Sequence, residues 1–275
     1  MSANYNSLNL DLQGVVKKVY DDLLFRSSFM NFLNPAYLGE IRSTGTPMIE
    51  IIKTKPVDLA TPSGATAISP TLATYDSVKI DLTELDKHYS VAVDPRMNNI
   101  DQAIESQIAQ EDAAIAKAID TYGYGKLTSA THSFELTEDP IEDINALKAQ
   151  LFNNNAYDDY KMGLEATYYG KLVAKLTSIL KFETLAGVEG VDRGTVAKAY
   201  GVDIFPIAST VLTAGDVGFF TNVEAVAGDM YFSNFNQFAE YPGLPGMFVI
   251  EGRAMFGADI VRDEAIVKLV DQVSA

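Results

Sequence analysis

The sequence predicts an α+β chain, and three observations support that prediction. Several short segments between residues 48 and 93 alternate apolar and polar side chains, which is the period of a half-buried strand. A longer segment that follows repeats isoleucine at helical spacing. The second half of the chain mixes both patterns. With 275 residues, the chain can form one large or two modest domains around a sizeable core.

Composition narrows the classes of function. The chain has 21 Lys and Arg against 37 Asp and Glu, and its net charge of −16 disfavours a protein that grips nucleic acid through a basic surface. It has no cysteine, so disulfides, thiolate nucleophiles, iron–sulfur clusters and cysteine zinc sites are excluded. Charges interrupt every apolar segment, and the N-terminus lacks a leader pattern. We therefore expect neither a membrane span nor a targeting peptide.

The first elements are expected to be a helix and then strands. Within residues 12–33, after a loose arm, a stripe of valine and leucine predicts a short amphipathic helix: Val15, Val16, Val19, Leu23 and Leu24. The segments MIEIIKTK, YDSVKIDL and HYSVAV follow, and each alternates like a half-buried strand.

Residues 56–74 separate the first two of these strands. This segment is rich in Pro, Thr, Ala and Gly, and its one charged residue is Asp58. Such a composition cannot form a core of its own, and a connection this long is unusual inside a compact domain. Two interpretations stay open: a flexible surface loop, or an extended hairpin arm that reaches onto another subunit.

A long helix is predicted next. The apolar residues recur at steps of three, four and seven: Ile100, Ile104, Ile108, Ile115, Ile119 and Tyr122. We expect this helix to begin near Asn98 or Asn99 and to end at Gly123 after about seven turns. Its acidic residues are expected to form a solvated or subunit-facing surface and not a catalytic pair: Asp101, Glu105, Glu111, Asp112 and Asp120.

The rest of the chain alternates helices and strands. DPIEDINALKAQLF predicts a helix capped by Asp139 with Pro140 at its first position. KMGLEA is a strand candidate, and YYGKLVAKLTSIL predicts a helix with an apolar side made by Leu172, Val173, Leu176 and Ile179. A glycine-spaced segment, residues 187–201, leads to the buried strand VDIFPIAS. The C-terminal stretch from Gly246 to Val270 is expected to hold two or three β segments.

Residues that carry chemistry are few. The sequence contains no nucleophile elbow, phosphate loop, HExxH motif or dinucleotide fingerprint. His88 and His132 are far apart and are interpreted as structural. Gly187, Gly190 and Gly194 are flanked by acidic residues, which favours a loop over a phosphate cradle. We therefore predict no catalytic residue, no cofactor-binding residue, no metal ligand and no cofactor.

The order of these elements resembles the major capsid protein of tailed bacteriophages, which has the Hong Kong 97-type fold. TGTPMIEIIKTK with YDSVKIDLTELDKHYSVAVDPRMNN looks like the family's extended loop and the strand that leads into its spine helix. IDQAIESQIAQEDAAIAKAIDTY is similar to the spine helix itself. The ending GMFVIEGRAMFGADIVRDEAIVKLV looks like the strands that close the peripheral domain.

The resemblance implies a domain plan. It consists of an N-terminal arm and helix (1–34), an extended β-hairpin loop with peripheral-domain strands (35–94), the long spine helix (95–129), an axial domain (130–245) and C-terminal strands of the peripheral domain (246–275). The axial domain would meet its copies at the fivefold and sixfold centres, with residues 187–201 as a candidate tip.

The resemblance also implies a function that is not enzymatic. The chain would self-assemble as pentamers and hexamers into the icosahedral head shell that encloses viral double-stranded DNA. Its other partners would be a separate scaffolding protein, a portal and a decoration protein, and it would contact no membrane. It would be found in the virion, after assembly in the host bacterial cytoplasm.

Some members of this family join neighbouring subunits by an isopeptide bond between a hairpin lysine and an asparagine. Residues 56–74 contain no lysine, so we expect a shell held by non-covalent contacts.

Two alternatives stay open. One is an encapsulin, a bacterial compartment shell of the same fold that encloses cargo enzymes. The other is an acidic hydrolase or lectin-like binding protein. The absence of tryptophan, the usual sugar platform, weakens a glycosidase interpretation.

Overall fold

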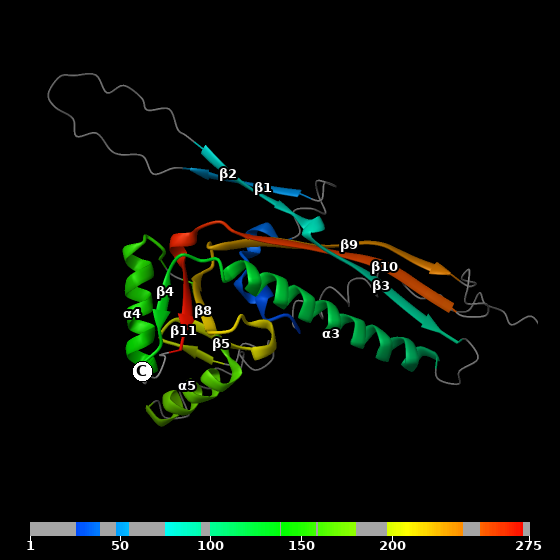
Figure 1. Ribbon diagram of the computed structural model, residues 1–275. Helices are drawn as coiled ribbons and strands as arrows, with labels where there is room; N and C mark the ends of the chain where they lie inside the picture. The colour runs from blue at the N-terminus through cyan, green and yellow to red at the C-terminus, as the bar shows by residue number, and fades with distance from the viewer. Residues whose placement is uncertain are drawn as a thin grey trace, which may run out of the picture.

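The computed structural model describes residues 26–38, 48–54, 75–94, 100–137, 139–157, 159–179, 197–238 and 248–271. Within these ranges the strands form three separate sheets, of two, three and six strands. Figure 1 shows a hairpin at one side, a long three-stranded sheet in the middle with helix α3 beside it, and a compact α and β region at one end.

The hairpin consists of β1 (Met48–Thr54) and β2 (Tyr75–Asp81), which pair antiparallel from Met48 and Asp81 to Thr54 and Tyr75. Both strands were predicted from alternation, and both are confirmed. Residues 56–74, for which two interpretations were open, lie outside the described residues. The pairing of Thr54 with Tyr75 shows that this segment connects the two strands of a hairpin.

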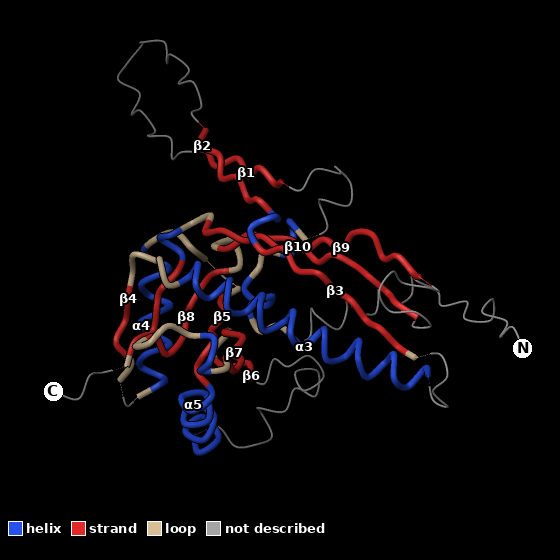
Figure 2. The backbone as a smooth tube through the Cα atoms, turned by 45° about the vertical axis from the view of Figure 1, so that its right-hand side comes forward, coloured by secondary structure: helices blue, strands red, loops and turns tan. Residues whose placement is uncertain are grey.

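The three-stranded sheet has the order β3 (Leu85–Val93), β10 (Phe248–Ile260) and β9 (Val226–Phe238), with antiparallel pairing throughout. The short 3₁₀ helix Leu82–Glu84 joins β2 to β3. The sheet lies between the hairpin on one side and helix α3 (Ile100–Leu127) on the other, as both Figure 1 and Figure 2 show. Strands β3 and β10 were expected, whereas β9 was not.

Helix α3 corrects two predictions. It does not end at Gly123 but continues to Leu127, because Gly123 serves close packing and not termination. A Cβ atom at Gly123 would lie 2.4 Å from the nearest ring atoms of Phe29. The acidic face is also not uniformly solvated, since Asp112 is fully buried and Asp120 is 9% exposed.

The six-stranded sheet has the order β4 (Ser133–Glu135), β11 (Ile266–Val270), β8 (Asp216–Asn222), β5 (Tyr160–Glu165), β7 (Val202–Ile207) and β6 (Ala197–Ala199). Helices α4 (Pro140–Asn153) and α5 (Ala166–Ile179) pack against it. The strands at β5, β7 and β11 and both helices were predicted, and Asp139 caps α4 by accepting hydrogen bonds from the amides of Ile141 and Glu142. Strands β4 and β8 were not anticipated, and neither was β6, which lies in the segment 187–201 that was expected to be a loop.

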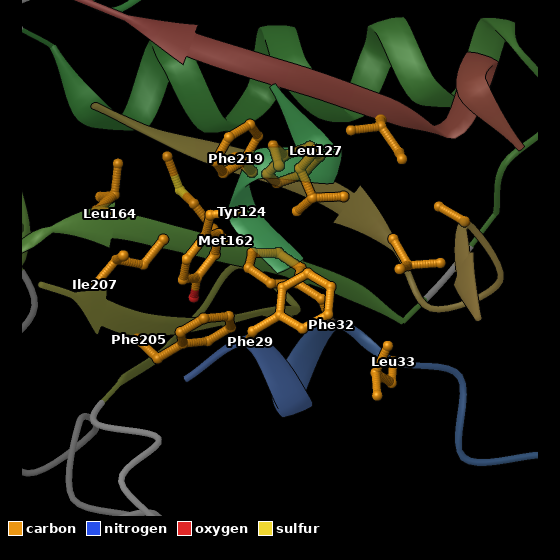
Figure 3. Close-up of a cluster of buried hydrophobic side chains, with 14 of the residues drawn as sticks. Phe29, Phe32, Leu33, Tyr124, Leu127, Met162, Leu164, Phe205, Ile207 and Phe219 are labelled. Atoms are coloured by element: carbon orange, nitrogen blue, oxygen red, sulfur yellow. The ribbon is translucent and has the colours of Figure 1, made fainter. Parts of the chain in front are cut away.

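Aromatic side chains form the centre of the main core, where α3 meets the six-stranded sheet (Figure 3). Phe29 and Phe32 come from the 3₁₀ helix Phe29–Phe32. The Phe29 ring is 5.5 Å from that of Tyr124, and the Phe32 ring is 4.8 Å from that of Phe205. Most of the amphipathic helix expected within residues 12–33 lies outside the described residues, but its described end is this 3₁₀ helix.

Candidate subunit-contact surfaces

The hairpin has an apolar inner face and an exposed outer face. Ile49, Ile51 and Ile80 are at most 4% exposed, and they belong to a second hydrophobic cluster with Ala227 of β9 and Met255 of β10. The alternate residues of β1 point outward, because successive side chains of a strand face opposite sides. Met48 is 47% exposed and Ile52 is 66% exposed. The hairpin is therefore anchored on one side and presents apolar side chains on the other.

A close backbone contact holds the base of the hairpin. A Cβ atom at Gly257 of β10 would lie 2.4 Å from the carbonyl oxygen of Asp81. Asp81 itself accepts hydrogen bonds from the amide and the hydroxyl of Thr83, at 2.8 and 2.7 Å, which starts the 3₁₀ helix after β2. These bonds hold the pKa of Asp81 below its usual range. Only a glycine at position 257 lets the chain cross the sheet at this distance.

A polar joint connects the same 3₁₀ helix to α3. Lys126 Nζ lies 2.7 Å from the Glu84 carboxylate, and the Tyr122 hydroxyl donates to that carboxylate as well. The bonds from Lys126 and Tyr122 lower the pKa of Glu84. Burial and the bond to Glu84 raise the pKa of Tyr122 to about 12. Tyr122 also donates to the carbonyl of Ala258, at 3.3 Å, so the joint links hairpin base, helix and sheet.

Asp120, a buried carboxylate on α3, holds the segment that leads into the core. Asp120 accepts hydrogen bonds from the hydroxyl of Ser27 at 2.6 Å, the hydroxyl of Ser28 at 3.0 Å and the amide of Phe29 at 2.9 Å. Burial raises the pKa of Asp120, although these bonds oppose the rise. The Tyr124 hydroxyl donates to Ser28 at 2.8 Å and completes the contact.

An ion pair braces the three-stranded sheet. Arg253 of β10 binds the carboxylate of Asp86 of β3 through two nitrogens, with Nε at 2.7 Å from Oδ1. The bond from Arg253 lowers the pKa of Asp86. Both side chains lie in the solvent-accessible layer, so their role is to fix the geometry of the strands more than to add stability.

The two histidines lie at different sheets, and His88 pairs in register with Arg253 of β10. His88 lies exposed on β3, and His132 lies just before β4. Within the described ranges, no group of three or more His, Asp or Glu residues could hold a metal ion. Gly187, Gly190 and Gly194 lie outside the described residues. No helix of the described part is long and apolar enough to cross a bilayer.

A pocket of about 590 Å³ lies between α4, α5 and β5. Its charged and polar lining groups already bind one another. Asp143 accepts from the amide and the hydroxyl of Thr137, at 3.0 and 2.8 Å. A hydrogen bond to Asp271 raises the pKa of Tyr168 to about 12, and Lys171 Nζ lies 4.8 Å from the centre of the Tyr168 ring. These contacts stabilise the walls of the pocket.

Comparison with known proteins decides the fold. No family model and no curated protein matches the sequence. Among solved structures, a chain of Mycobacterium phage Che8 superposes with a TM-score of 0.63 at 18% identity, covering 88% of this chain and 90% of the other. The head structure of Helicobacter pylori bacteriophage KHP40 gives a TM-score of 0.61 at 11% identity, with 91% of both chains covered. The chain has the Hong Kong 97-type capsid fold.

The resemblance to tailed-phage major capsid proteins, first seen in the order of the elements, is therefore confirmed at the level of the fold. The capsid fold is shared more widely, because a virus-like particle from Pyrococcus furiosus also superposes. That match has a TM-score of 0.58 at 11% identity and covers 94% of this chain and 98% of the other.

Some residues that shape the capsid fold have no recognisable signal in the sequence. Phe29 and Phe32 are buried in the main core. Asp120, which was assigned to a solvated or subunit-facing surface, accepts a hydrogen bond from the amide of Phe29. For β9, the segment DMYFSNF offered a usable signal, since it is rich in aromatic residues and lies before a run of glycine and proline. No comparable local signal marks Gly257, whose role depends on a strand that is distant in sequence.

Proposed function

We propose that this chain is a major capsid protein that self-assembles as pentamers and hexamers into an icosahedral head shell enclosing viral double-stranded DNA. The observation that carries the proposal is that phage head and capsid structures match nearly the full length of both chains. The matches span 83 to 91% of each chain, which is far more than a single common motif would cover.

The hairpin supports the intersubunit part of the proposal. Its inner face is anchored by Ile49, Ile51 and Ile80, while Met48 and Ile52 stay exposed on the outer face. Exposed apolar side chains on a projecting element are typical of a surface that another chain covers. We propose that residues 48–81, whose central stretch 56–74 contains a single charged residue, Asp58, lie across a neighbouring subunit.

The domain plan is also part of the proposal, with two revisions. We keep 1–34 as the arm, 35–94 as the extended loop with its strands and 95–129 as the spine helix. Sheet pairing favours moving Val226–Phe238 from the axial to the peripheral domain, because β9 pairs with β10. It also favours moving Ile266–Val270 to the axial domain, because β11 pairs with β8 and β4.

The acidic composition agrees with this role. A shell that surrounds packaged DNA needs an inner wall that does not bind phosphate tightly, and a net charge of −16 weakens such binding. Partners other than further copies would be a separate scaffolding protein, a portal and a decoration protein. The expected location is the virion, after assembly in the host bacterial cytoplasm, and the role is not enzymatic.

An encapsulin-type compartment shell is the second candidate. It is favoured by the superposition on the virus-like particle from Pyrococcus furiosus, which covers 98% of that chain. Both candidates are shells, so particle formation alone does not separate them.

Analysis of particle contents tests the proposal. Particles isolated from cells that carry the gene in its natural setting are treated with nuclease and then opened. Double-stranded DNA protected inside the particles is the expected result. A foreign protein cargo without DNA would favour the compartment shell. A monomer or small oligomer on size-exclusion chromatography would contradict both shells and favour a hydrolase or binding protein.

A further inference from the structure

The outward side of helix α4 and of the turn after it exposes aromatic and amide side chains. We call it the α4 face and define it by Asn145, Ala149, Phe152, Asn153 and Tyr157. All five residues are exposed. The first four lie at helical spacing, so they form one stripe on α4.

Two aromatic side chains stand out from this face. Phe152 is 59% exposed and Tyr157 is 52% exposed. Their ring centroids are 4.9 Å apart, and the rings meet edge to face at 80°. The Tyr157 hydroxyl donates to Asn155 Oδ1 at 2.8 Å, which fixes the ring further. Because the pair is already ordered, a partner that covers it loses little conformational entropy.

A hollow lies beside the aromatic pair. Its volume is about 240 Å³, and it is lined by Lys148, Ala149, Phe152, Asn153 and Tyr160. Protruding aromatic side chains beside a pocket are typical of the centre of protein interfaces, where aromatic anchors fill pockets of the partner.

Charge points to the kind of partner. The sequence from Ile144 to Tyr157 contains no carboxylate, although the chain has 37 Asp and Glu residues in total. Its one charged residue is Lys148, whose ammonium donates to the carbonyl of Tyr200 at 2.7 Å and lies 5.4 Å from the centre of the Tyr160 ring. The α4 face is therefore apolar and amide-rich between two acidic ends, where Glu142 and Asp159 are exposed.

We propose that the α4 face is a contact surface for a second copy of this chain. Two copies that each carry a charge of −16 repel one another, so contact is least costly where carboxylates are absent. A basic partner of another kind would instead be attracted to surfaces rich in carboxylates. This inference rests on the proposed function and adds a second intersubunit surface, separate from the hairpin.

A pair of substitutions tests the surface. Phe152→Glu places a carboxylate at its centre, whereas Phe152→Tyr keeps the aromatic ring. Because Phe152 is exposed, both variants are expected to retain the wild-type circular dichroism and melting temperature. We expect Phe152→Glu to lower the yield of particles, counted by electron microscopy, at least tenfold, and Phe152→Tyr to assemble like the wild type. A normal yield from Phe152→Glu overturns the inference.

Photo-crosslinking identifies the molecule that covers the α4 face. The aromatic photo-crosslinker p-benzoylphenylalanine at position 157 is irradiated in assembled particles, and the products are identified by mass spectrometry. A covalent dimer whose second peptide comes from this chain is the expected result. Particles that form but show no such dimer, or link to a different protein, overturn the inference while leaving the proposed shell function intact. If the wild-type chain forms no particles at all, the proposed function fails first.

Discussion

Two neighbouring residues of α3 hold the segment after Arg26 in place by different means. Asp120 accepts hydrogen bonds from Ser27, Ser28 and Phe29, and Gly123 leaves room for the Phe29 ring one turn further along. The Asp120 carboxylate fixes the backbone of residues 27–29. The absence of a side chain at Gly123 lets the Phe29 ring enter the core next to α3. Together they join the N-terminal part of the described chain to the long helix.

Replacing two glycines of α3 by alanine is expected to change the free energy of unfolding in opposite directions. Gly123→Ala is expected to lower the free energy of unfolding by about 1–3 kcal/mol, because the new methyl group would overlap the Phe29 ring. Gly125 has open space around its Cβ position. Gly125→Ala is therefore expected to raise the free energy of unfolding by up to about 1 kcal/mol, through helix propensity alone.

Urea unfolding followed by circular dichroism measures both variants. If both raise the free energy of unfolding equally, Gly123 has no packing role and the contact with Phe29 is wrong.

The buried side of α3 could be predicted from the sequence, whereas the roles of Gly123 and Asp120 could not. The spacing of Ile115 and Ile119 correctly predicted the buried side of α3, because periodicity reflects burial directly. Gly123 was interpreted as a stop signal, which is the usual meaning of glycine after an apolar repeat. Its actual role depends on Phe29, which lies far away in the sequence. Asp120 was assigned to a solvated or subunit-facing surface for the same reason, since its hydrogen-bond donors are also distant in the sequence.

At the scale of elements, the hairpin was predicted more reliably than the sheets. Each strand of the hairpin shows its own alternation, and the two strands pair from Met48 and Asp81 to Thr54 and Tyr75. The three-stranded sheet joins β3, β10 and β9, which come from distant parts of the chain. No local pattern reveals which strands become neighbours, so the order of the strands in the sheets could not be predicted.

Removing residues 57–71 tests the role of the hairpin. The ends of β1 and β2 would be joined by a short glycine-containing turn between Thr54 and Tyr75, which already pair. The subunit should keep its melting temperature, because Ile49, Ile51 and Ile80 remain in the core. Particle formation, followed by sedimentation, should be lost. Normal particles from this variant would mean that the hairpin does not hold neighbouring subunits.

The joint of Glu84, Tyr122 and Lys126 predicts a pH dependence. The pKa of Glu84 is lowered in the folded chain, so its contribution to stability is present above the ordinary value of 4.5 and is lost as the pH falls through the lowered pKa. The pKa of Tyr122 is raised to about 12 from 10.0, so its contribution is present below pH 10.0 and is lost as the pH rises through about 12.

A double-mutant cycle of Glu84→Gln and Lys126→Met measures this joint. At pH 7 we expect a coupling energy of about 0.5–1 kcal/mol, because both side chains are partly exposed. The coupling should disappear in acid, once Glu84 is protonated. A coupling energy that does not change with pH would show that the ion pair does not form in solution.

For the whole molecule, charge and cross-linking chemistry predict how the shell is held together. Residues 56–74 offer no lysine for an isopeptide bond. The lysines near this segment are Lys55, directly before it and outside the described residues, and Lys53 and Lys79 on the paired strands. Mature particles boiled in denaturing detergent should therefore run as a single band near 29.9 kDa. A ladder of linked multimers would show covalent joining and would point to one of these lysines.

Electron microscopy of the purified chain, at high concentration and with a scaffolding partner present, tests the central claim most directly. The hairpin, the exposed residues Met48 and Ile52 and the α4 face are surfaces that a lone subunit leaves uncovered. We predict rings of five and six subunits or closed icosahedral shells. A uniform population of single subunits under these conditions would contradict the account.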